Sequence, residues 1–207
     1  MRPVWFPDWP GHDCLIVASG PSAVEQPIAA ARGRCKAIVI NNSWWLAPWA
    51  EILYACDAEW WQSGNGNDFA GLKVSRSHHP GVMQVRLRPD GEAWCNRILM
   101  DEMGEIGAGG SSCFQALNLA VQFGCRRIAL VGCDARIDKG KHWHPDHGGR
   151  LKNPVQQTAD IWVRSFQAAA QDLVALGVEV TNCSPDSAIN AFVKAPLAHW
   201  IDGCSNG

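Results

Sequence analysis

An apolar run that ends in a glycine turn is the feature that most constrains the fold of this chain. Residues 14–18 predict a buried β-strand, the turn Ser19-Gly20-Pro21-Ser22 follows at once, and residues 22–32 predict a helix. The first backbone N–H groups of such a helix have no internal partner and carry the positive end of its dipole. The strand, turn and helix together predict an anion pocket, for which phosphate is the usual ligand.

Apolar strands and helices alternate along most of the sequence. Further strands are predicted at 36–41, 52–56, 127–132 and 178–182, weaker ones at 72–75 and 82–87, and further helices at 111–123 and 155–176. The remaining segments are an irregular arm (1–12), a variable insert (62–110) with loops at 62–71 and 107–110, a histidine-rich loop (135–154) and a helix start at Pro185-Asp186-Ser187. This order predicts a single α/β domain over 1–207, with a Rossmann-like, mostly parallel sheet and helices on both faces.

Polar residues fall where the predicted strands end, and ligands of parallel sheets bind at that edge. These residues are Gly20, Pro21, Ser22, Asn41, Asn42, Asp57, Asp134 and Asn182. Their positions predict a nucleotide-type ligand. The pairs Trp44-Trp45 and Trp60-Trp61 follow two of the strands, and we expect them to stack on a base or sugar, to fill core gaps or to form an oligomer interface.

The composition argues against several classes of protein. The chain has 18 Lys+Arg against 20 Asp+Glu, so it has no excess of basic residues for binding nucleic acid. No apolar run approaches the ~20 residues that cross a bilayer, and residues 1–11 lack the pattern of a signal peptide. The nine cysteines include no C-x-x-C pair, which favours free thiols in a reducing compartment. We therefore expect a cytoplasmic protein that has no membrane partner and is able to form a homo-oligomer.

The run His142-Trp143-His144-Pro145-Asp146-His147 is the densest group of chemically active side chains. Its H-x-H-x-D-H spacing is that of the metal motif of metallo-β-lactamases, but only 60 residues follow it, too few for the later ligands of that fold. Three interpretations stay open. His142, His144, Asp146 and His147 are candidate metal ligands, one histidine is a candidate general base, or the segment is a solvated loop.

A second glycine-rich segment, Gly109-Gly110-Ser111-Ser112, precedes the helix predicted at 111–123. Hydroxyls and free amides at a helix start suit a carboxylate or a phosphate, whereas the simpler interpretation is an N-cap, which Ser112 could supply. Neither this segment nor the first turn is a P-loop or a G-x-G-x-x-G motif.

With these residues in place, the chain resembles the bacterial sialyltransferases of the Campylobacter type, which are GT-A-like glycosyltransferases of family 42. It also resembles the related DUF115 group, which includes the archaeal 6-hydroxymethylpterin pyrophosphokinase and small phage and prophage proteins. The likeness covers most of the chain. Its motifs are the turn at 17–22, Asn41-Asn42, Asp57, the stretch from Ser111-Ser112-Cys113 to Gly132-Cys133-Asp134, and the tail from Asn182-Cys183-Ser184-Pro185-Asp186-Ser187 to Pro196.

The resemblance implies a role for each matching residue. Ser19, Gly20, Pro21, Ser22, Asn41, Asn42, Asp57 and Asp134 would hold the nucleotide of a CMP-type sugar, and Ser111 and Ser112 the carboxylate of the sugar. A loop histidine would deprotonate the acceptor hydroxyl without a metal cofactor; His147 is the first choice, with His144 and His142 as alternatives.

The chain also departs from this family. The segment 62–105 shows no match to the acceptor lid of the family, and the tyrosine pair that assists the leaving phosphate is missing, since Tyr54 is the only tyrosine. Trp143, Arg136 and Lys141 are candidate replacements. The compact form is most similar to the phage-borne members. The leading expectation is a nucleotide-sugar glycosyltransferase encoded by a phage or prophage. The alternatives are a pyrophosphoryl transferase that needs Mg²⁺, with Asp57, Asp134, Asp146 or the loop histidines near the metal, and a non-catalytic phage-associated binding protein.

Overall fold

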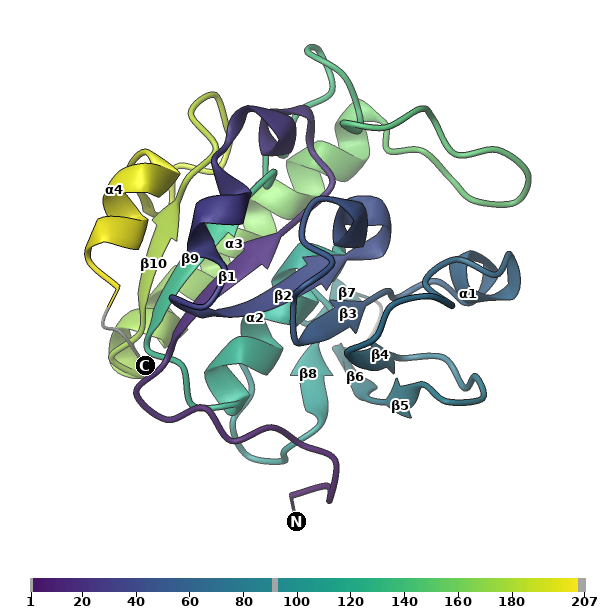
Figure 1. The fold of residues 1–207 in the computed structure, drawn as a ribbon, viewed down its shortest axis with the longest axis horizontal. Helices are drawn as coiled ribbons and strands as arrows, with labels where there is room; N and C mark the ends of the chain where they lie inside the picture. The colour runs from purple at the N-terminus through teal and green to yellow at the C-terminus, as the bar shows by residue number, and fades with distance from the viewer. Residues whose placement is uncertain (1, 91–92, 205–207) are drawn as a thin grey trace.

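The computed structural model describes residues 2–90 and 93–204 and confirms the α/β fold (Figure 1). A parallel sheet with the strand order β11-β10-β9-β1-β2-β3-β4-β5 forms its centre. The strands are β1 (Asp13–Val17), β2 (Lys36–Ile40), β3 (Ile52–Tyr54), β4 (Leu72–Ser75), β5 (Met83–Gln84), β9 (Arg127–Val131), β10 (Glu179–Asn182) and β11 (Val193–Lys194). A smaller sheet, in the order β7-β6-β8, consists of β6 (Arg86–Asp90), β7 (Ala93–Trp94) and β8 (Glu105–Gly107).

The strand order reverses at β1. From β1 the chain adds β2 to β5 on one side, and then returns to place β9, β10 and β11 on the other side. Strand β1 pairs in parallel with both β2 and β9. Such a reversal leaves a crevice outside the carboxyl ends of the two central strands, which is where open α/β sheets bind their ligands.

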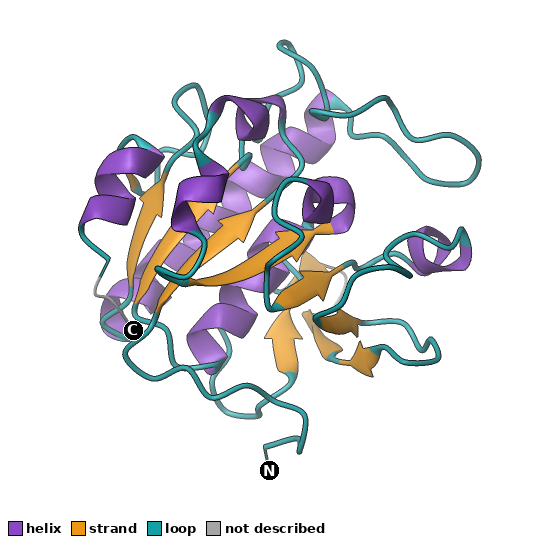
Figure 2. Ribbon diagram, in the orientation of Figure 1, coloured by secondary structure: helices purple, strands orange, loops and turns teal. Residues whose placement is uncertain are grey.

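Both faces of the central sheet are buried, as the continuous apolar strands predict. Along β1, Cys14 and Ile16 face the layer of α2 (Ser112–Gln122) and α3 (Gln156–Ala175), while Leu15 and Val17 face α4 (Leu197–Asp202) and the short turns. Figure 2 shows the sheet between these two layers, and the two core clusters lie on its opposite sides.

The helix predicted at 22–32 is wrong in type. Two short 3₁₀ helices, η1 (Pro21–Glu25) and η2 (Ile28–Ala31), occupy the segment. Pro27 lies between them, and a proline both lacks a backbone N–H and disfavours helical geometry in the residue before it. Gln26 is accordingly extended, with φ −97° and ψ 146°. The two turns are too short to carry the dipole that a longer α-helix would have.

Three further expectations need correction. No helix begins at 185–187, because the Ser187 hydroxyl donates to the Cys133 carbonyl oxygen at 2.7 Å and the Ala188 N–H to the Asp134 carbonyl oxygen at 2.8 Å. The strand expected over 82–87 is two strands, β5 and β6, with Val85 between them. Gly107 ends β8 instead of opening a loop. The short helices η3 (Asn41–Trp45) and α1 (Ala58–Gln62) were not predicted.

The two long helices and the N-terminal arm follow the sequence closely. Helices α2 and α3 begin and end within about a residue of their predicted bounds, which is the usual uncertainty at helix termini. The described part of the arm has no helix or strand, and it packs against the end of α2, where the rings of Phe6 and Trp9 contact Phe123 edge-on. Among the described residues, no helix combines the length and apolar character needed to cross a membrane.

Candidate functional site

A cavity of about 710 Å³ opens at the carboxyl ends of the central strands. It lies at the strand-order reversal, between the turn after β1 and the segment after β9. Many of the residues that the sequence singled out line it: Ser19, Gly20, Asn41, Asp57, Ser111, Ser112, Asp134, His142 and His147. The other candidates, namely Pro21, Ser22, Asn42, His144, Asp146 and Asn182, are not in its lining.

The turn after β1 is filled by groups of the protein itself. The Gly20 N–H donates to the Gly132 carbonyl oxygen at 2.8 Å, and the Ser22 N–H donates to Asp134 Oδ2 at 3.0 Å. The Ser22 hydroxyl donates to the other oxygen of the same carboxylate. Because Asp134 is buried against the turn, it takes the place that the sequence assigned to a phosphate. An external anion would have to displace this carboxylate to reach the Ser22 N–H.

The close approach of the two strand ends depends on glycine. A Cβ atom on Gly20 would lie 2.5 Å from Asp134 Oδ2 and 2.5 Å from the Gly132 carbonyl oxygen. Gly132 itself has φ +66°, in the left-handed region that favours glycine. The turn after β1 and the end of β9 therefore form one rigid wall of the cavity.

The N-terminus of α2 offers free donors where the first turn does not. The predicted N-cap is confirmed at Ser111 rather than at Ser112, since the Ser111 hydroxyl accepts the Phe114 N–H at 3.2 Å. Ser112 lines the cavity, and its N–H is one of the first donors of the helix, which have no partner within the helix. An anion in the cavity is therefore best placed at Ser112.

Two strained residues flank this site. Asn41 and Ala135 both have φ +49°, which is unusual for residues other than glycine, and both line the cavity. The side-chain oxygen Oδ1 of Asn41 is buried without a hydrogen-bond partner in the described structure. Strain and an unsatisfied buried oxygen tend to occur where function requires them. The ends of β2 and β9 both show such features at the cavity.

The histidine-rich loop is fixed to the ends of β1 and β2 through Trp143. The Trp143 N–H donates to the Ser19 carbonyl oxygen at 3.0 Å, and its indole Nε1–H donates to Ser43 Oγ at 3.1 Å. Farther along the loop, Asn153 accepts the His147 N–H at 2.9 Å and donates to the His147 carbonyl oxygen at 3.0 Å. These contacts hold the loop against the cavity. The indole N–H of Trp143, which we expected as a candidate donor to a leaving phosphate, is already bonded to Ser43.

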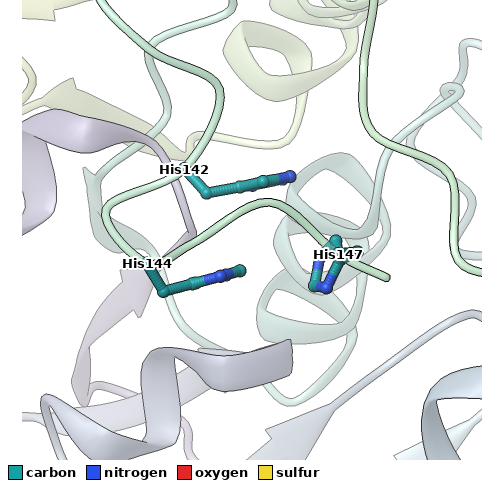
Figure 3. A group of neighbouring side chains, drawn as sticks. All are labelled: His142, His144 and His147. Carbon is teal, nitrogen blue, oxygen red and sulfur yellow. The ribbon is translucent and has the colours of Figure 1, made fainter. Parts of the chain in front are cut away.

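The three imidazoles of this loop come together (Figure 3). The rings of His142 and His144 stack with their centroids 4.8 Å apart, and the His147 ring is 4.7 Å from the first and 4.9 Å from the second. Burial, with the charges of the other two imidazoles, lowers the pKa of His142 to about 4. Burial, and then the charge of His144, lowers the pKa of His147. Both rings are thus held in the neutral form that accepts a proton.

Asn42 connects this group to the sheet without lining the cavity. Its Oδ1 accepts the Trp60 Nε1–H at 3.0 Å, and its Nδ2 lies 3.4 Å from His144 Nε2. Asp146, which the sequence grouped with the histidines, is not among the converging ligand atoms, and its carboxylate pairs with Lys141 Nζ at 2.7 Å. Asn42 therefore positions His144, and Asp146 neutralises a lysine.

The sequence analysis missed two basic residues of the cavity, Arg76 and Lys152. Neither has a carboxylate partner within 4 Å among the described residues, whereas Arg136 pairs with Asp138. Arg76 follows the end of β4, so the strand-end pattern could have identified it once the weak strand at 72–75 was accepted. Lys152 lies in a loop, and no pattern in the sequence marks it.

The aromatic residues serve the core more than the cavity. Trp44, Trp60 and Trp61 are buried and only Trp45 is exposed, so the tryptophan pairs fill core gaps. Trp60 alone of these four also lines the cavity. Tyr54 is buried, where desolvation raises its pKa, and its hydroxyl donates to Gln115 Oε1 at 2.8 Å.

The chain was compared with protein families, curated proteins and solved structures. Neither a protein-family model, nor a curated protein, nor a solved structure matches it.

Proposed function

We propose that this chain is a small glycosyltransferase-like enzyme that binds a CMP-type nucleotide sugar in the cavity and activates an acceptor hydroxyl with its histidine loop. The observation that carries the proposal is the convergence of polar residues from separate strand ends on one cavity of about 710 Å³. A volume of this size is typical of small-molecule sites, which cover roughly 300–1,000 Å³. Its position at the strand-order reversal is also that of nucleotide sites in other open α/β sheets.

The charges around the cavity suit a donor of this kind. Arg76 and Lys152 are free to neutralise phosphate oxygens, and the N-terminus of α2 with the Ser112 hydroxyl suits the carboxylate of the sugar. Asn41 offers an unpaired side-chain oxygen to a base or a ribose hydroxyl. The Asp134 carboxylate is already hydrogen-bonded, so we assign it a structural role at the wall of the site.

The acceptor would react on the side of the histidine loop. The acceptor oxygen would attack the anomeric carbon in line with the departing nucleotide, and its proton would pass to the loop as the new C–O bond forms. His147 is the first choice as base because it lines the cavity and its lowered pKa keeps it neutral near pH 7. His142 also lines the cavity, and His144 lies beside both as a further alternative.

The alternatives receive less support. A Mg²⁺-dependent pyrophosphoryl transferase needs free carboxylates, but Asp134 is bound to Ser22 and Asp146 to Lys141, which leaves Asp57. A non-catalytic binding protein would tolerate the loss of all three loop histidines. An unchanged phenotype of the triple His→Ala variant would favour that alternative over an enzyme.

Calorimetric titration of the EDTA-treated protein with CMP and with CMP-sialic acid tests the donor site. We expect dissociation constants below millimolar for both. Ser112→Ala should weaken binding of the sugar nucleotide by about tenfold, the loss expected for one hydrogen bond to a charged group, with little effect on CMP. The exposed Ser63 provides the control variant Ser63→Ala. If neither CMP nor another nucleotide binds below millimolar, the donor assignment is wrong.

A further inference from the structure

Three imidazoles in mutual contact are more than a general base requires. A base needs one neutral ring and a group that orients it, whereas here three rings lie together: His142 and His144 are stacked 4° from parallel, and His147 is tilted against both. The three ligand atoms lie within 4.8 Å of one another (Figure 3). No carboxylate contributes to this group among the described residues. The ligand atoms of this group are therefore imidazole nitrogens alone.

One ring nitrogen of the cluster is buried without a hydrogen-bond partner among the described residues, as expected of a position where a ligand binds. His142 Nε2 is buried and has no hydrogen-bond partner in the described structure, an arrangement that is costly unless an ion or water fills it. His144 Nδ1 lies 2.8 Å from the Pro145 carbonyl oxygen. With the proton on Nδ1 and donated to that carbonyl, Nε2 keeps its lone pair, which faces the Asn42 Nδ2 donor at 3.4 Å and would turn from it to the ion. A backbone carbonyl is a common outer partner of a metal-binding histidine.

The loop is constructed so that the rings cannot easily separate. Trp143 lies between the first two histidines. Its backbone N–H donates to the Ser19 carbonyl oxygen, just after β1, and its indole N–H donates to the Ser43 hydroxyl within η3. Asn153 fixes the backbone of His147 from both sides. The three donors are thus presented by a segment anchored at its centre and at its end, which reduces the ordering cost of binding an ion.

We propose that His142, His144 and His147 bind one divalent transition-metal ion of the Zn²⁺ class, with a fourth position that opens into the cavity. Imidazole ligands suit Zn²⁺, Cu²⁺ and Ni²⁺ rather than Mg²⁺ or Ca²⁺, which prefer oxygen. Tetrahedral Zn–N bonds of ~2.0–2.1 Å place the nitrogens roughly 3.3 Å apart. The rings would therefore close inward by about 1 Å from their present positions through side-chain rotation.

The open position follows from where the ligands lie. His142 and His147 line the cavity, while His144 is held on the far side by Asn42. Three histidines with a fourth site for water or substrate is the arrangement of catalytic zinc centres, where the ion makes a bound oxygen more acidic. Resting on the proposed function, this inference makes the ion the group that acidifies the acceptor hydroxyl, and the released proton would pass to the Asp57 carboxylate, which lines the cavity, or to solvent. Transfer would then be lost in EDTA.

Metal binding is tested directly on this chain, residues 1–207, stripped with EDTA and then titrated with Zn²⁺ or Co²⁺. We expect one equivalent of Zn²⁺ per chain after dialysis, and visible absorption bands of tetrahedral Co²⁺ on cobalt loading. His142→Ala, His144→Ala and His147→Ala should each weaken Zn²⁺ binding by more than ~100-fold, above the effect of losing an outer partner. The exposed His78 and His199 supply matched controls, His78→Ala and His199→Ala, which should bind like the wild type.

Two results would overturn the inference. One is a wild-type protein that retains no stoichiometric Zn²⁺ and gives no tetrahedral cobalt spectrum, a result that needs no variant to fold. The other is Zn²⁺ binding that survives in the triple histidine variant. Titration with CMP in the presence of EDTA separates a failure of the metal site from a failure of the proposed function. Nucleotide binding without metal binding would refute the metal site alone, and metal binding without nucleotide binding would refute the donor site alone.

Discussion

Replacement of Asp134 by alanine tests whether an internal carboxylate holds the first turn. Asp134 is 8% exposed and Ser22 is 9% exposed, so their contacts are made away from water. The variant would remove both acceptors of Ser22, the one for its N–H at 3.0 Å and the one for its hydroxyl. An unsatisfied buried donor costs about 1–3 kcal/mol. The hydroxyl can rotate toward another acceptor but the N–H cannot, so we expect a total loss of about 3 kcal/mol.

For a chain of this length, such a loss lowers the melting temperature by about 6–12 °C, since each kcal/mol corresponds to ~2–4 °C. Thermal unfolding followed by circular dichroism measures the shift. Asp138→Ala is the matched control, because Asp138 lies in the same segment, is exposed and pairs with Arg136 at the surface. Its change should stay below about 2 °C, as expected for a surface ion pair.

A double-mutant cycle of Ser22→Ala with Asp134→Ala then separates their contact from general damage. Contacting residues show interaction energies of about 0.5–3 kcal/mol, so the double variant should be less destabilised than the sum of the two single variants. Additive losses, or a melting temperature of Asp134→Ala within 2 °C of the wild type, would refute the idea that this carboxylate anchors the turn. Gly20→Ala should be strongly destabilising as well. Its φ of −66° is ordinary, so the collision with Asp134 Oδ2 at 2.5 Å would be the cause.

Further predictions concern stability away from the cavity. Ser111→Ala should lower the unfolding free energy by about 1 kcal/mol through loss of the α2 cap, whereas Ser112→Ala should change urea stability by less than half as much, since Ser112 caps nothing. The hydrogen bond from Arg97 lowers the pKa of Asp172. The pair therefore stabilises the fold above the unfolded pKa of ~3.9 and loses its contribution as pH falls below it. The stability gap between wild type and Asp172→Asn should thus be constant from pH 5 to 8 and narrow below pH 4, in urea titrations across that range. A gap that widens in acid would contradict this. Tyr54→Phe should cost about 1 kcal/mol in the same assay, because its hydroxyl is buried and hydrogen-bonded.

The sequence predicted the architecture well because the architecture depends on local pattern. The apolar strands at β1, β2 and β9 are buried on both faces, and such runs indicate a parallel sheet whatever their partners. Helices α2 and α3 are long, periodic and bounded by capping residues or glycine. The helix predicted at 22–32 was wrong for a reason already visible in the sequence, because Pro27 divides the segment.

The sequence predicted the site less well, because a site is made of non-local contacts. The strand-end rule alone brought Asn41, Asp57 and Asp134 to one edge of the sheet, where all three line the cavity. That rule cannot say that the Asp134 carboxylate turns to Ser22, 112 residues away in the chain. Nor can spacing along a loop say that His142, His144 and His147 converge while Asp146 pairs with Lys141. These outcomes depend on where the loop is anchored, and the anchor is Trp143, which from the sequence was only one of three candidate donors to a leaving phosphate.

The internal carboxylate changes the meaning of the first turn. In a phosphate-binding turn the free N–H groups hold the ligand, and here Asp134 and the Gly132 carbonyl already accept them. Under the proposed function, ligand recognition would come from what surrounds the turn, namely the α2 N-terminus at Ser112 and the histidine loop. If these two regions act on different parts of one ligand, Ser112→Ala should weaken donor binding without affecting Zn²⁺, and His147→Ala should do the reverse. Their combined effect on transfer should be additive in free energy, as it is for sites without a shared contact. A strong interaction energy between them would place both on the same ligand group and would contradict this division of roles.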